Sequence, residues 1–247
     1  MPSLVLLRHG QSSWNAEGRF TGWVDVDLTE AGEAQAALAG GLLAAESDLD
    51  VEYVHTSLLT RAVRTADIAL AAMGRSWLPV QRSWRLNERH YGALQGLGKV
   101  ETAERFGAEE VHGWRRGYRT PPPPLARDDP GHPSNDFRYR AVAPGALPST
   151  ECLADVVARA IPYFEDAIAP ELLAGSAVLV VAHGNSIRAL AKFLENISDE
   201  AIVDLEIPTG IPRRYDLGRS LEVRDVYYLG NPDDAARAAE AVALEAG

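Results

Sequence analysis

The chain has 247 residues, 46% of them hydrophobic, a single cysteine and a formal net charge of −11 at pH 7. This length suffices for one α/β domain with a large core, and the acidic charge argues against nucleic acid or an anionic membrane surface as a partner. The lone Cys152 excludes an intramolecular disulfide and suits a reducing compartment.

The first predicted element is a strand at residues 4–7, an apolar run typical of a strand buried on both faces of a parallel sheet. A helix should follow, capped by Asp27 or Thr29 and extending to about residue 47. Its predicted buried face consists of Ala34, Leu38, Leu42 and Ala45. A second strand is expected at 51–55, and Ser57 is the predicted N-cap of the helix after it.

The middle of the chain departs from this alternation. A third strand at 77–81 and a polar helix around 100–106 are expected to precede the change. Residues 107–148 then carry four consecutive prolines, at 121–124, and little apolar periodicity. Because long loops in compact domains are commonly functional and a proline run is stiff and extended, we interpret 107–148 as a cap inserted into an α/β domain.

Regular structure is predicted to resume with a helix at about 151–169, capped by Thr150 and kinked at Pro162. The remaining predicted elements are a strand at 177–182, a helix at 186–195 with Asn185 as N-cap, strands around 213–217 and 223–228, and a tail from 231 that is a helix or a frayed end. This pattern predicts a three-layer α/β/α fold, with a mostly parallel central sheet and helices on both faces, in a single domain over 1–247.

Two of the predicted strands end in the same pair of residues. His9 and Gly10 follow the first strand, and His183 and Gly184 follow the strand at 177–182. Ligands bind beside the carboxyl ends of strands in open parallel sheets, so the two imidazoles should meet at one crevice if these strands are neighbours. A neutral imidazole is both a nucleophile and a leaving group, which suits phosphoryl transfer through a phosphohistidine. The Gly10 carbonyl is the candidate partner for the second ring nitrogen of His9.

Arginine supplies almost all of the positive charge, and several arginines adjoin these motifs. Arg8 precedes His9, and Arg61 lies early in a predicted helix, where the helix dipole disfavours a cation. We therefore expect Arg8, Arg61 and His183 to stabilise a transferring phosphoryl group without a metal. Glu88 is the candidate general acid and base, although a salt bridge to an arginine would be the simpler explanation of that residue alone.

No metal site is predicted. The histidines show no paired ligand spacing, and the one cysteine lacks a second thiol. Four of the histidines are expected to be structural or on the surface: His55, His90, His112 and His132. The absence of a P-loop and of a GxGxxG motif after a strand argues against a nucleotide-binding fold.

Five segments carry a wider resemblance: Leu7-Arg8-His9-Gly10 with Trp14-Asn15, Phe20-Thr21-Gly22-Trp23, Glu88-Arg89-His90-Tyr91-Gly92, Trp114-Arg115-Arg116 before the prolines, and His183-Gly184-Asn185-Ser186. Together they resemble the cofactor-dependent phosphoglycerate mutases of the histidine phosphatase superfamily, and the likeness continues through 207–210 to 228–230. The Arg-His-Gly motif marks the superfamily alone, whereas the segments beginning at Glu88 and Trp114 are more specific to the mutases.

The resemblance implies that 2-phosphoglycerate and 3-phosphoglycerate are interconverted, as in glycolysis and gluconeogenesis. It implies that 2,3-bisphosphoglycerate phosphorylates His9, that Glu88 donates and accepts the proton, and that His183 stabilises the transition state. The transferring phosphoryl group would be held by Arg8, Asn15, Arg61 and His183. The rest of the phosphoglycerate pocket would comprise Ser12, Thr21, Gly22, Tyr91, Lys99, Arg115, Arg116, Gly184 and Asn185.

Two positions depart from that family. Gln11 stands where many members have glutamate, which removes one acid near the expected nucleophile. Residues 245–247 lack the lysines with which some members close the site, so a role for the tail as a lid is not expected.

Three alternative functions remain open at this stage. A phosphatase of the same superfamily would pass the phosphoryl group from His9 to water, but the mutase-like cap argues against it. A non-catalytic phospho-ligand binding module is disfavoured because His9 and Glu88 are both retained. A metal-dependent mutase would be inhibited by chelators.

The expected partners are small-molecule phosphoglycerates, with no nucleic acid and no membrane. Alanine-rich helix faces are compatible with a homo-oligomer, either a dimer or a tetramer. Because no signal segment follows Met1 and the apolar runs are too short to span a bilayer, we expect a cytoplasmic protein.

Overall fold

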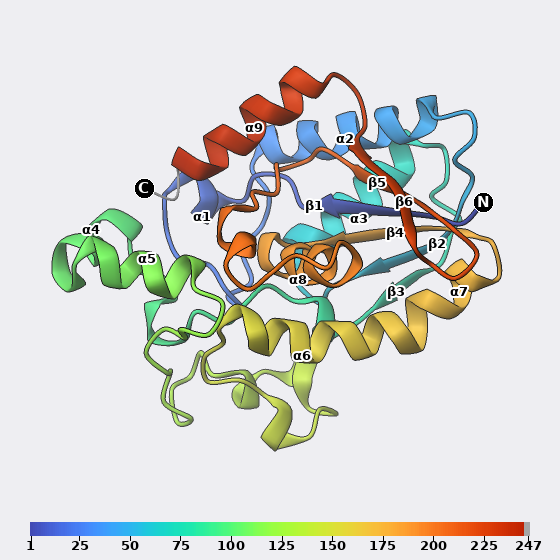
Figure 1. The fold of residues 1–247 in the computed structure, drawn as a ribbon. Coiled ribbons are helices and arrows are strands. Elements are labelled where there is room, and N and C mark those ends of the chain that lie inside the picture. The colour runs from blue at the N-terminus through green and yellow to red at the C-terminus, as the bar shows by residue number, and fades with distance from the viewer. Residues whose placement is uncertain (245–247) are drawn as a thin grey trace.

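The computed structural model of the chain describes residues 1–244, which form a three-layer α/β/α fold (Figure 1). Its centre is a six-stranded sheet in the order β3-β2-β4-β1-β5-β6. The strands are β1 (Ser3–Arg8), β2 (Val51–Thr56), β3 (Val80–Arg82), β4 (Ala177–Ala182), β5 (Arg213–Leu217) and β6 (Val223–Tyr228). The strands from β3 to β1 run parallel, and β5 and β6 add an antiparallel edge, so the predicted mostly parallel sheet is confirmed.

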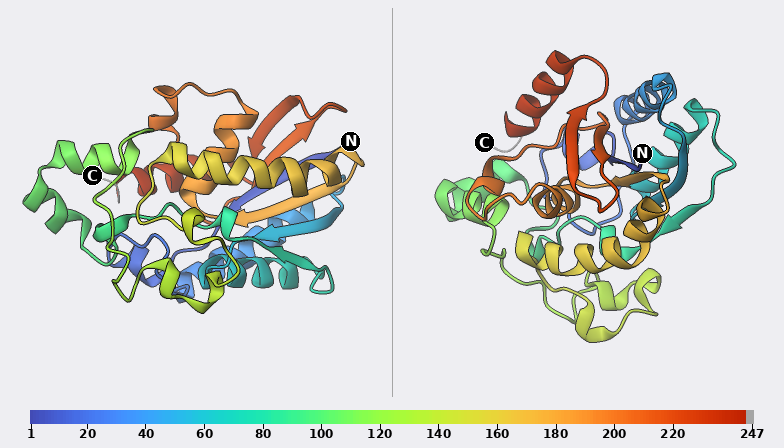
Figure 2. Two further views of the ribbon diagram at one scale, coloured as in Figure 1. Left: turned by 90° about the horizontal axis from the view of Figure 1, so that it is seen from below. Right: turned by 45° about the vertical axis from the view of Figure 1, so that its right-hand side comes forward.

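Helices cover both faces of this sheet, as the views in Figure 2 show. Helices α2 (Glu30–Ala45) and α3 (Thr60–Ala72) pack on one face. Helices α6 (Leu153–Tyr163), α7 (Ala169–Leu173) and α8 (Gly184–Leu194) pack on the other. The remaining α-helices are α1 (Ser13–Ala16), α4 (Lys99–Phe106), α5 (Ala108–Arg116) and α9 (Pro232–Leu244).

Strand β1 shows why the apolar run folds into a central strand. Successive side chains of a strand point to opposite faces, and here Val5 and Leu7 join the core beneath α2 and α3. Leu4 and Leu6 join the core beneath α6 to α8. An uninterrupted apolar run is what a strand buried on both faces requires.

The predicted buried face of α2 is wrong. Leu38 is 61% exposed, and the buried residues of the helix are Gly32, Ala36, Ala39, Gly40 and Leu43. The helix is rich in alanine and leucine around its whole circumference, so periodicity did not separate its faces. A Cβ at Gly40 would lie 2.3 Å from the carbonyl oxygen of Ala69, which shows that small residues set the close approach of α2 to α3.

Of the predicted N-caps, Thr29 is confirmed, whereas Ser57, Asn185 and Thr150 are wrong. Leu59, not Ser57, precedes α3, and His183, not Asn185, precedes α8. The Ser57 Oγ accepts a hydrogen bond from the Leu59 amide at 3.1 Å and contacts Nε2 of His183 at 2.8 Å. The side chain of Asn185 bonds Tyr91 and Arg188, so Ser57 and Asn185, which looked like caps, make tertiary contacts instead.

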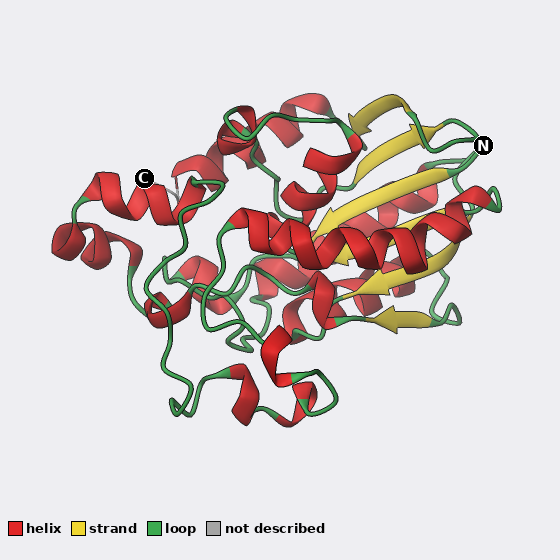
Figure 3. Ribbon diagram, turned by 60° about the horizontal axis from the view of Figure 1, so that its bottom comes forward, coloured by secondary structure: helices red, strands yellow, loops and turns green. Residues whose placement is uncertain are grey.

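The predicted cap segment, 107–148, begins with α5 and continues as irregular backbone with short 3₁₀ turns. Figure 3 shows loops and helices beyond the ends to which the parallel strands point. Thr150, the predicted cap of α6, instead donates its hydroxyl to the Pro122 carbonyl at 2.7 Å, and Cys152 precedes the helix. The amide of Ala93 bonds the next proline carbonyl, Pro123, at 2.8 Å, so the proline run is fixed between two parts of the chain.

Other boundaries shift by a few residues. The third strand occupies Val80–Arg82 rather than 77–81. The expected kink at Pro162 takes the form of a π-helical turn, Phe164–Ile168, which joins α6 to α7. Within residues 1–244, none of the helices combines the length and apolar character needed to cross a membrane.

Candidate active site

The two strand-end histidines meet. Strands β1 and β4 are parallel neighbours with Arg8 paired to Ala182, so the residue after each strand emerges at the same edge. The ring centroids of His9 and His183 lie 4.9 Å apart, and the His9 amide donates to the Ala182 carbonyl at 3.0 Å. Both side chains are buried.

The orientation of His9 leaves one ring nitrogen available as a nucleophile. Its Nδ1 lies 2.7 Å from the Gly10 carbonyl, which confirms the predicted partner. Because a carbonyl can only accept, Nδ1 carries the proton and Nε2 keeps its lone pair. The Nε of Arg61 donates to that Nε2 at 3.3 Å. Burial lowers the pKa of His9 well below 6.5, and the charges of Arg61 and Arg8 lower it further, so the imidazole is neutral at pH 7.

Gly10 is required for this arrangement. A Cβ at Gly10 would lie 2.1 Å from the Gly32 carbonyl oxygen, inside contact distance. The Gly10 amide also donates to the hydroxyl of Thr65 at 3.1 Å. The loop after β1 is thus pressed against α2 and bonded to α3, which fixes the carbonyl that holds His9.

The second histidine, His183, is oriented by a serine hydroxyl. Nε2 of His183 lies 2.8 Å from Oγ of Ser57, while its Nδ1 is buried with no hydrogen-bond partner among the described residues. Burial lowers the pKa of His183 well below 6.5, and the charges of Arg61 and His9 contribute in the same direction. A neutral ring with the hydroxyl of Ser57 donating to Nε2 carries its proton on Nδ1, where it can be donated to an anion.

Two arginines flank His9. Arg61 is almost fully buried and donates to the carbonyls of Gly22 at 2.8 Å and Val24 at 3.1 Å. Burial lowers its pKa to about 10, so the guanidinium remains charged at pH 7. Arg8 donates through Nη1 to the Ile207 carbonyl at 2.8 Å, and its buried Nε has no partner in the described part of the chain.

Glu88 lies beside this centre. One carboxylate oxygen, Oε1, accepts from its neighbour's amide, that of Arg89, at 2.7 Å and from the amide of Asn185 at 3.2 Å. The backbone carbonyl of Glu88 accepts from Nε1 of Trp23 and from Nη2 of Arg159, at 2.5 and 2.9 Å. A carboxylate fixed in this way can exchange a proton with a ligand in the cavity.

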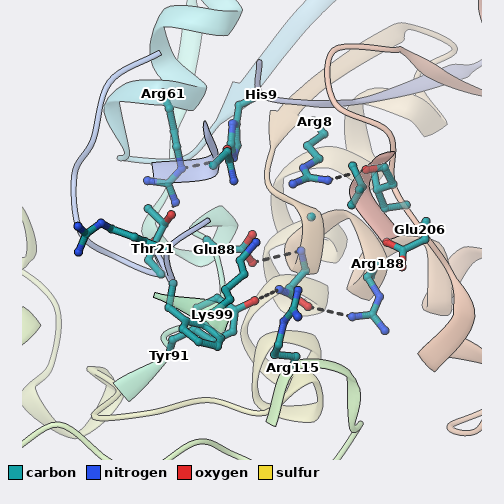
Figure 4. Close-up of a pocket in the computed structure, with 18 of the residues that line it drawn as sticks. Arg8, His9, Thr21, Arg61, Glu88, Tyr91, Lys99, Arg115, Arg188 and Glu206 are labelled. Atoms are coloured by element: carbon teal, nitrogen blue, oxygen red, sulfur yellow. Dashed lines mark hydrogen bonds between the residues drawn. The ribbon is translucent and has the colours of Figure 1, made fainter. Parts of the chain in front are cut away.

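These groups border one cavity, with an empty volume of about 760 Å³ counting the solvent at its mouth (Figure 4). The predicted residues that line it are Arg8, His9, Asn15, Thr21, Gly22, Arg61, Glu88, Tyr91, Lys99, Arg115, Arg116, Gly184 and Asn185. Two predicted residues, Ser12 and His183, are fully buried and are not among the lining residues, but the ring of His183 lies 4.9 Å from that of His9, which lines the cavity. Ser12 donates its hydroxyl to Oδ1 of Asn15 at 2.8 Å and so orients a residue that does line the cavity.

The cavity is strongly cationic although the protein is acidic. Among the described residues, seven cationic side chains and two carboxylates line it. The cations are Arg8, Arg19, Arg61, Lys99, Arg115, Arg116 and Arg188. Burial raises the pKa of Tyr91, but the charge of Arg89, the hydrogen bond from Arg89 and the charge of Arg115 together leave the pKa below its usual value. The arrangement suits a ligand with more than one negative group.

Several lining residues were not predicted from the sequence. Arg188 lies one helical turn after Gly184 on α8, a spacing that could have indicated it. Glu206 and Ile207 follow a short 3₁₀ turn and carry no such pattern. Val242 of α9 also reaches the cavity, whereas residues 245–247, for which a lid role was not expected, lie outside the described part of the chain.

The other histidines lie apart from the cavity lining. His55 bonds the hydroxyl of Tyr163 and the carboxylate of Glu171, at 2.9 and 2.7 Å. His132 bonds the hydroxyls of Ser134, in the predicted cap segment, and of Ser149, just after that segment. No cluster of three histidine, cysteine, aspartate or glutamate side chains suited to a metal ion occurs among residues 1–244.

Comparisons with known proteins agree with this geometry. The model of the histidine phosphatase superfamily (branch 1) matches residues 4–211. The fold is similar to mycobacterial glucosyl-3-phosphoglycerate phosphatase complexed with VO3, with a TM-score of 0.69 and 25% identity, covering 92% of this chain and 97% of that one. It is also similar to a putative alpha-ribazole-5'-P phosphatase from Escherichia coli, with a TM-score of 0.67 and 21% identity, covering 94% and 97%.

A third similar structure is Bacillus stearothermophilus YhfR, with a TM-score of 0.66 and 22% identity, covering 93% of this chain and 96% of that one. At this identity the likeness concerns the fold. The family match, in contrast, spans most of the chain and includes both strand-end histidines. The chain therefore belongs to branch 1 of the histidine phosphatase superfamily.

Proposed function

We propose that the protein is a 2,3-bisphosphoglycerate-dependent phosphoglycerate mutase that interconverts 2-phosphoglycerate and 3-phosphoglycerate through a phosphohistidine at His9. The observation that carries the proposal is the second cationic group in the cavity. Arg115 and Arg188 lie across it from His9 and Arg61 (Figure 4). A phosphoglycerate has a carboxylate in addition to its phosphoryl group, and this second group needs a cation of its own.

The cavity fits the bisphosphorylated cofactor. The Nε atoms of Arg8 and Arg188 and Nδ1 of His183 are buried nitrogens without a partner in the described residues, and a polyanion would satisfy such donors. When bound, 2,3-bisphosphoglycerate supplies the phosphoryl group that primes the enzyme. Arg8, Arg61 and His183 would hold the group being transferred, and Arg115, Arg116 and Lys99 the rest of the molecule.

The chain's own groups account for the chemistry. Nε2 of His9 is unprotonated and can attack phosphorus, while Nδ1 keeps its proton and donates it in a hydrogen bond to the Gly10 carbonyl. The charges of Arg8 and Arg61 oppose the negative charge that spreads over the equatorial oxygens. Glu88 takes the proton from the substrate hydroxyl as that oxygen accepts the phosphoryl group, and returns it in the reverse step.

A phosphatase is the second candidate, because two of the solved structures reported above are named as phosphatases. In that reaction water, in place of a phosphoglycerate hydroxyl, would accept the phosphoryl group from His9. The same residues would serve, so the two functions differ in how well the cavity retains the ligand and excludes water.

Labelling and rate measurements separate these functions. After incubation with labelled 2,3-bisphosphoglycerate, we expect an acid-labile phosphoryl group on His9 that is lost in His9→Ala and kept in the control His112→Ala, whose histidine is exposed. Isomerisation of 3-phosphoglycerate should exceed phosphate release and depend on added 2,3-bisphosphoglycerate. Phosphate release that dominates with or without it would establish the phosphatase instead. Loss of activity in EDTA would point to a metal-dependent reaction.

A further inference from the structure

Of the two carboxylates that line the cavity within the described residues, only Glu88 is used by the proposed reaction. The other, Glu206, lies across the cavity from His9 (Figure 4). Its Oε1 accepts from Nη2 of Arg116, the last residue of α5, and forms an ion pair with it. The side chains of this pair are 13% and 19% exposed, so the contact is largely shielded from solvent.

This carboxylate lies among several guanidinium groups whose positive charges repel one another. Burial and the charges of Arg89 and Arg116 together lower the pKa of Arg188 to about 10, and the charge of Glu206 opposes them. Burial likewise lowers the pKa of Arg115, again with Glu206 opposing. Without a ligand, the carboxylate of Glu206 therefore reduces the electrostatic repulsion among the guanidinium groups at this end of the cavity.

We propose that Glu206 is a specificity-determining residue, an internal anion that occupies Arg116 in the empty cavity and competes with the carboxylate of the ligand. The inference rests on the proposed function in so far as the ligand carries a carboxylate beside its phosphoryl group. The competition has a physical benefit, because a leaving product does not leave Arg116 unpaired. Glu206 thus weakens binding and favours release.

A purely structural role for the same ion pair predicts the opposite change in ligand affinity. Arg116 belongs to the segment from α4 to α5, whereas Glu206 adjoins Ile207, whose carbonyl holds Arg8. If the ion pair mainly fastened these segments over the ligand, removing it would weaken binding. If Glu206 competes with the ligand, removing its charge strengthens binding.

The test is the affinity of Glu206→Gln, which keeps the shape of the side chain and removes the charge. Calorimetry in a His9→Asn background, where no phosphoryl group can be taken up, compares 3-phosphoglycerate with glycerol 3-phosphate, which lacks the carboxylate. For 3-phosphoglycerate we expect the Kd of Glu206→Gln to be about tenfold lower than that of the protein that keeps Glu206. This is the effect of one charge-assisted hydrogen bond of ordinary strength. For glycerol 3-phosphate we expect a change of less than about twofold on the same scale.

A matched control removes the same charge elsewhere. Glu195 pairs with Arg213 at 2.9 Å, and the exposures of that pair are 11% and 20%, but neither residue lines the cavity. Glu195→Gln should therefore leave both affinities unchanged. An equal gain for both ligands, the same gain in the control, or weaker binding in Glu206→Gln would each overturn the proposal. Because the assay measures binding alone, a failure of the proposed mutase reaction would not alter its outcome.

Discussion

The strongest structural prediction concerns the buried pair formed by Glu151 and Arg159, whose side chains are 4% and 6% exposed. Arg159 donates to both carboxylate oxygens of Glu151, at 2.6 and 2.9 Å. Its other contacts are the carbonyls of Arg85, Asn87 and Glu88, at 2.7, 3.0 and 2.9 Å. One guanidinium therefore joins the start of α6 to the backbone of the proposed acid and base.

Replacing Glu151 with glutamine tests this connection. Oε2 of Glu151 also accepts from the His90 amide at 2.8 Å, so the variant disturbs three hydrogen bonds and leaves the charge of Arg159 buried without compensation. Removing one partner of a buried ion pair costs about 3–5 kcal/mol. For a protein of this size that corresponds to a melting temperature lower by roughly 6–20 °C.

Urea denaturation followed by circular dichroism measures the loss, with Glu17→Gln as control. Glu17 pairs with Arg19 on the surface, where the two side chains are about half exposed, and its loss should change stability by less than about 1 kcal/mol. In the folded fraction of Glu151→Gln, kcat should fall more than the affinity for inorganic phosphate, because Glu88 is displaced while the arginines remain. A loss of stability below about 1 kcal/mol, or equal falls in kcat and phosphate affinity, would refute this reasoning.

Three further changes have expected outcomes. Ser57→Ala removes the hydroxyl that orients His183, so kcat should fall about tenfold with KM little changed, and Ser57→Thr should restore most of it; steady-state kinetics would decide. Gly10→Ala forces a Cβ against the Gly32 carbonyl, so labelling of His9 should fall sharply in a phosphorylation assay even if the variant folds. Burial holds the pKa values of His9 and His183 below that of the unfolded chain, which therefore binds more protons below about pH 6.5. The free energy of unfolding should then fall between pH 6.5 and 5.5, by up to about 1.4 kcal/mol per histidine, and equal urea midpoints at the two pH values would contradict this.

The sequence predicted those parts of the fold that depend on local patterns. The strands β4, β5 and β6 occupy the predicted residues, because apolar or alternating runs bounded by turns specify a strand almost alone. The faces of α2 could not be predicted, since its small residues are selected by contact with α3. Thr29 caps α2 as predicted, but Ser57 and Asn185 are not caps because they bond groups of the site, and such tertiary partners leave no local signal.

The candidate site likewise contains residues that the sequence predicted and one that it did not. His9, His183 and Arg61 were predicted because strand ends and helix starts are readable in a sequence, and their meeting needed only that β1 and β4 be neighbours. Glu206 was missed because nothing in its spacing relates it to the cap. The ion pair between Glu206 and Arg116 joins residues 90 positions apart. Local sequence periodicity cannot reveal a contact over that distance in the sequence.

The two ends of the cavity come from different parts of the chain, and this difference bears on whether the protein transfers a phosphoryl group or hydrolyses it. The end of the cavity at His9 is built by β1, β4 and α3, which belong to the buried core, and either of the two proposed reactions would use it unchanged. The far end is built by α5, the segment at Glu206 and Val242 of α9, which come from the cap and the C-terminal region. A mutase must keep its bisphosphorylated intermediate while the molecule reorients, and only contacts at this far end can do so without impeding attack at His9. The balance between the two reactions should therefore respond to substitutions at Arg116 and Glu206 more than to any change at the nucleophile, which would lower both rates together.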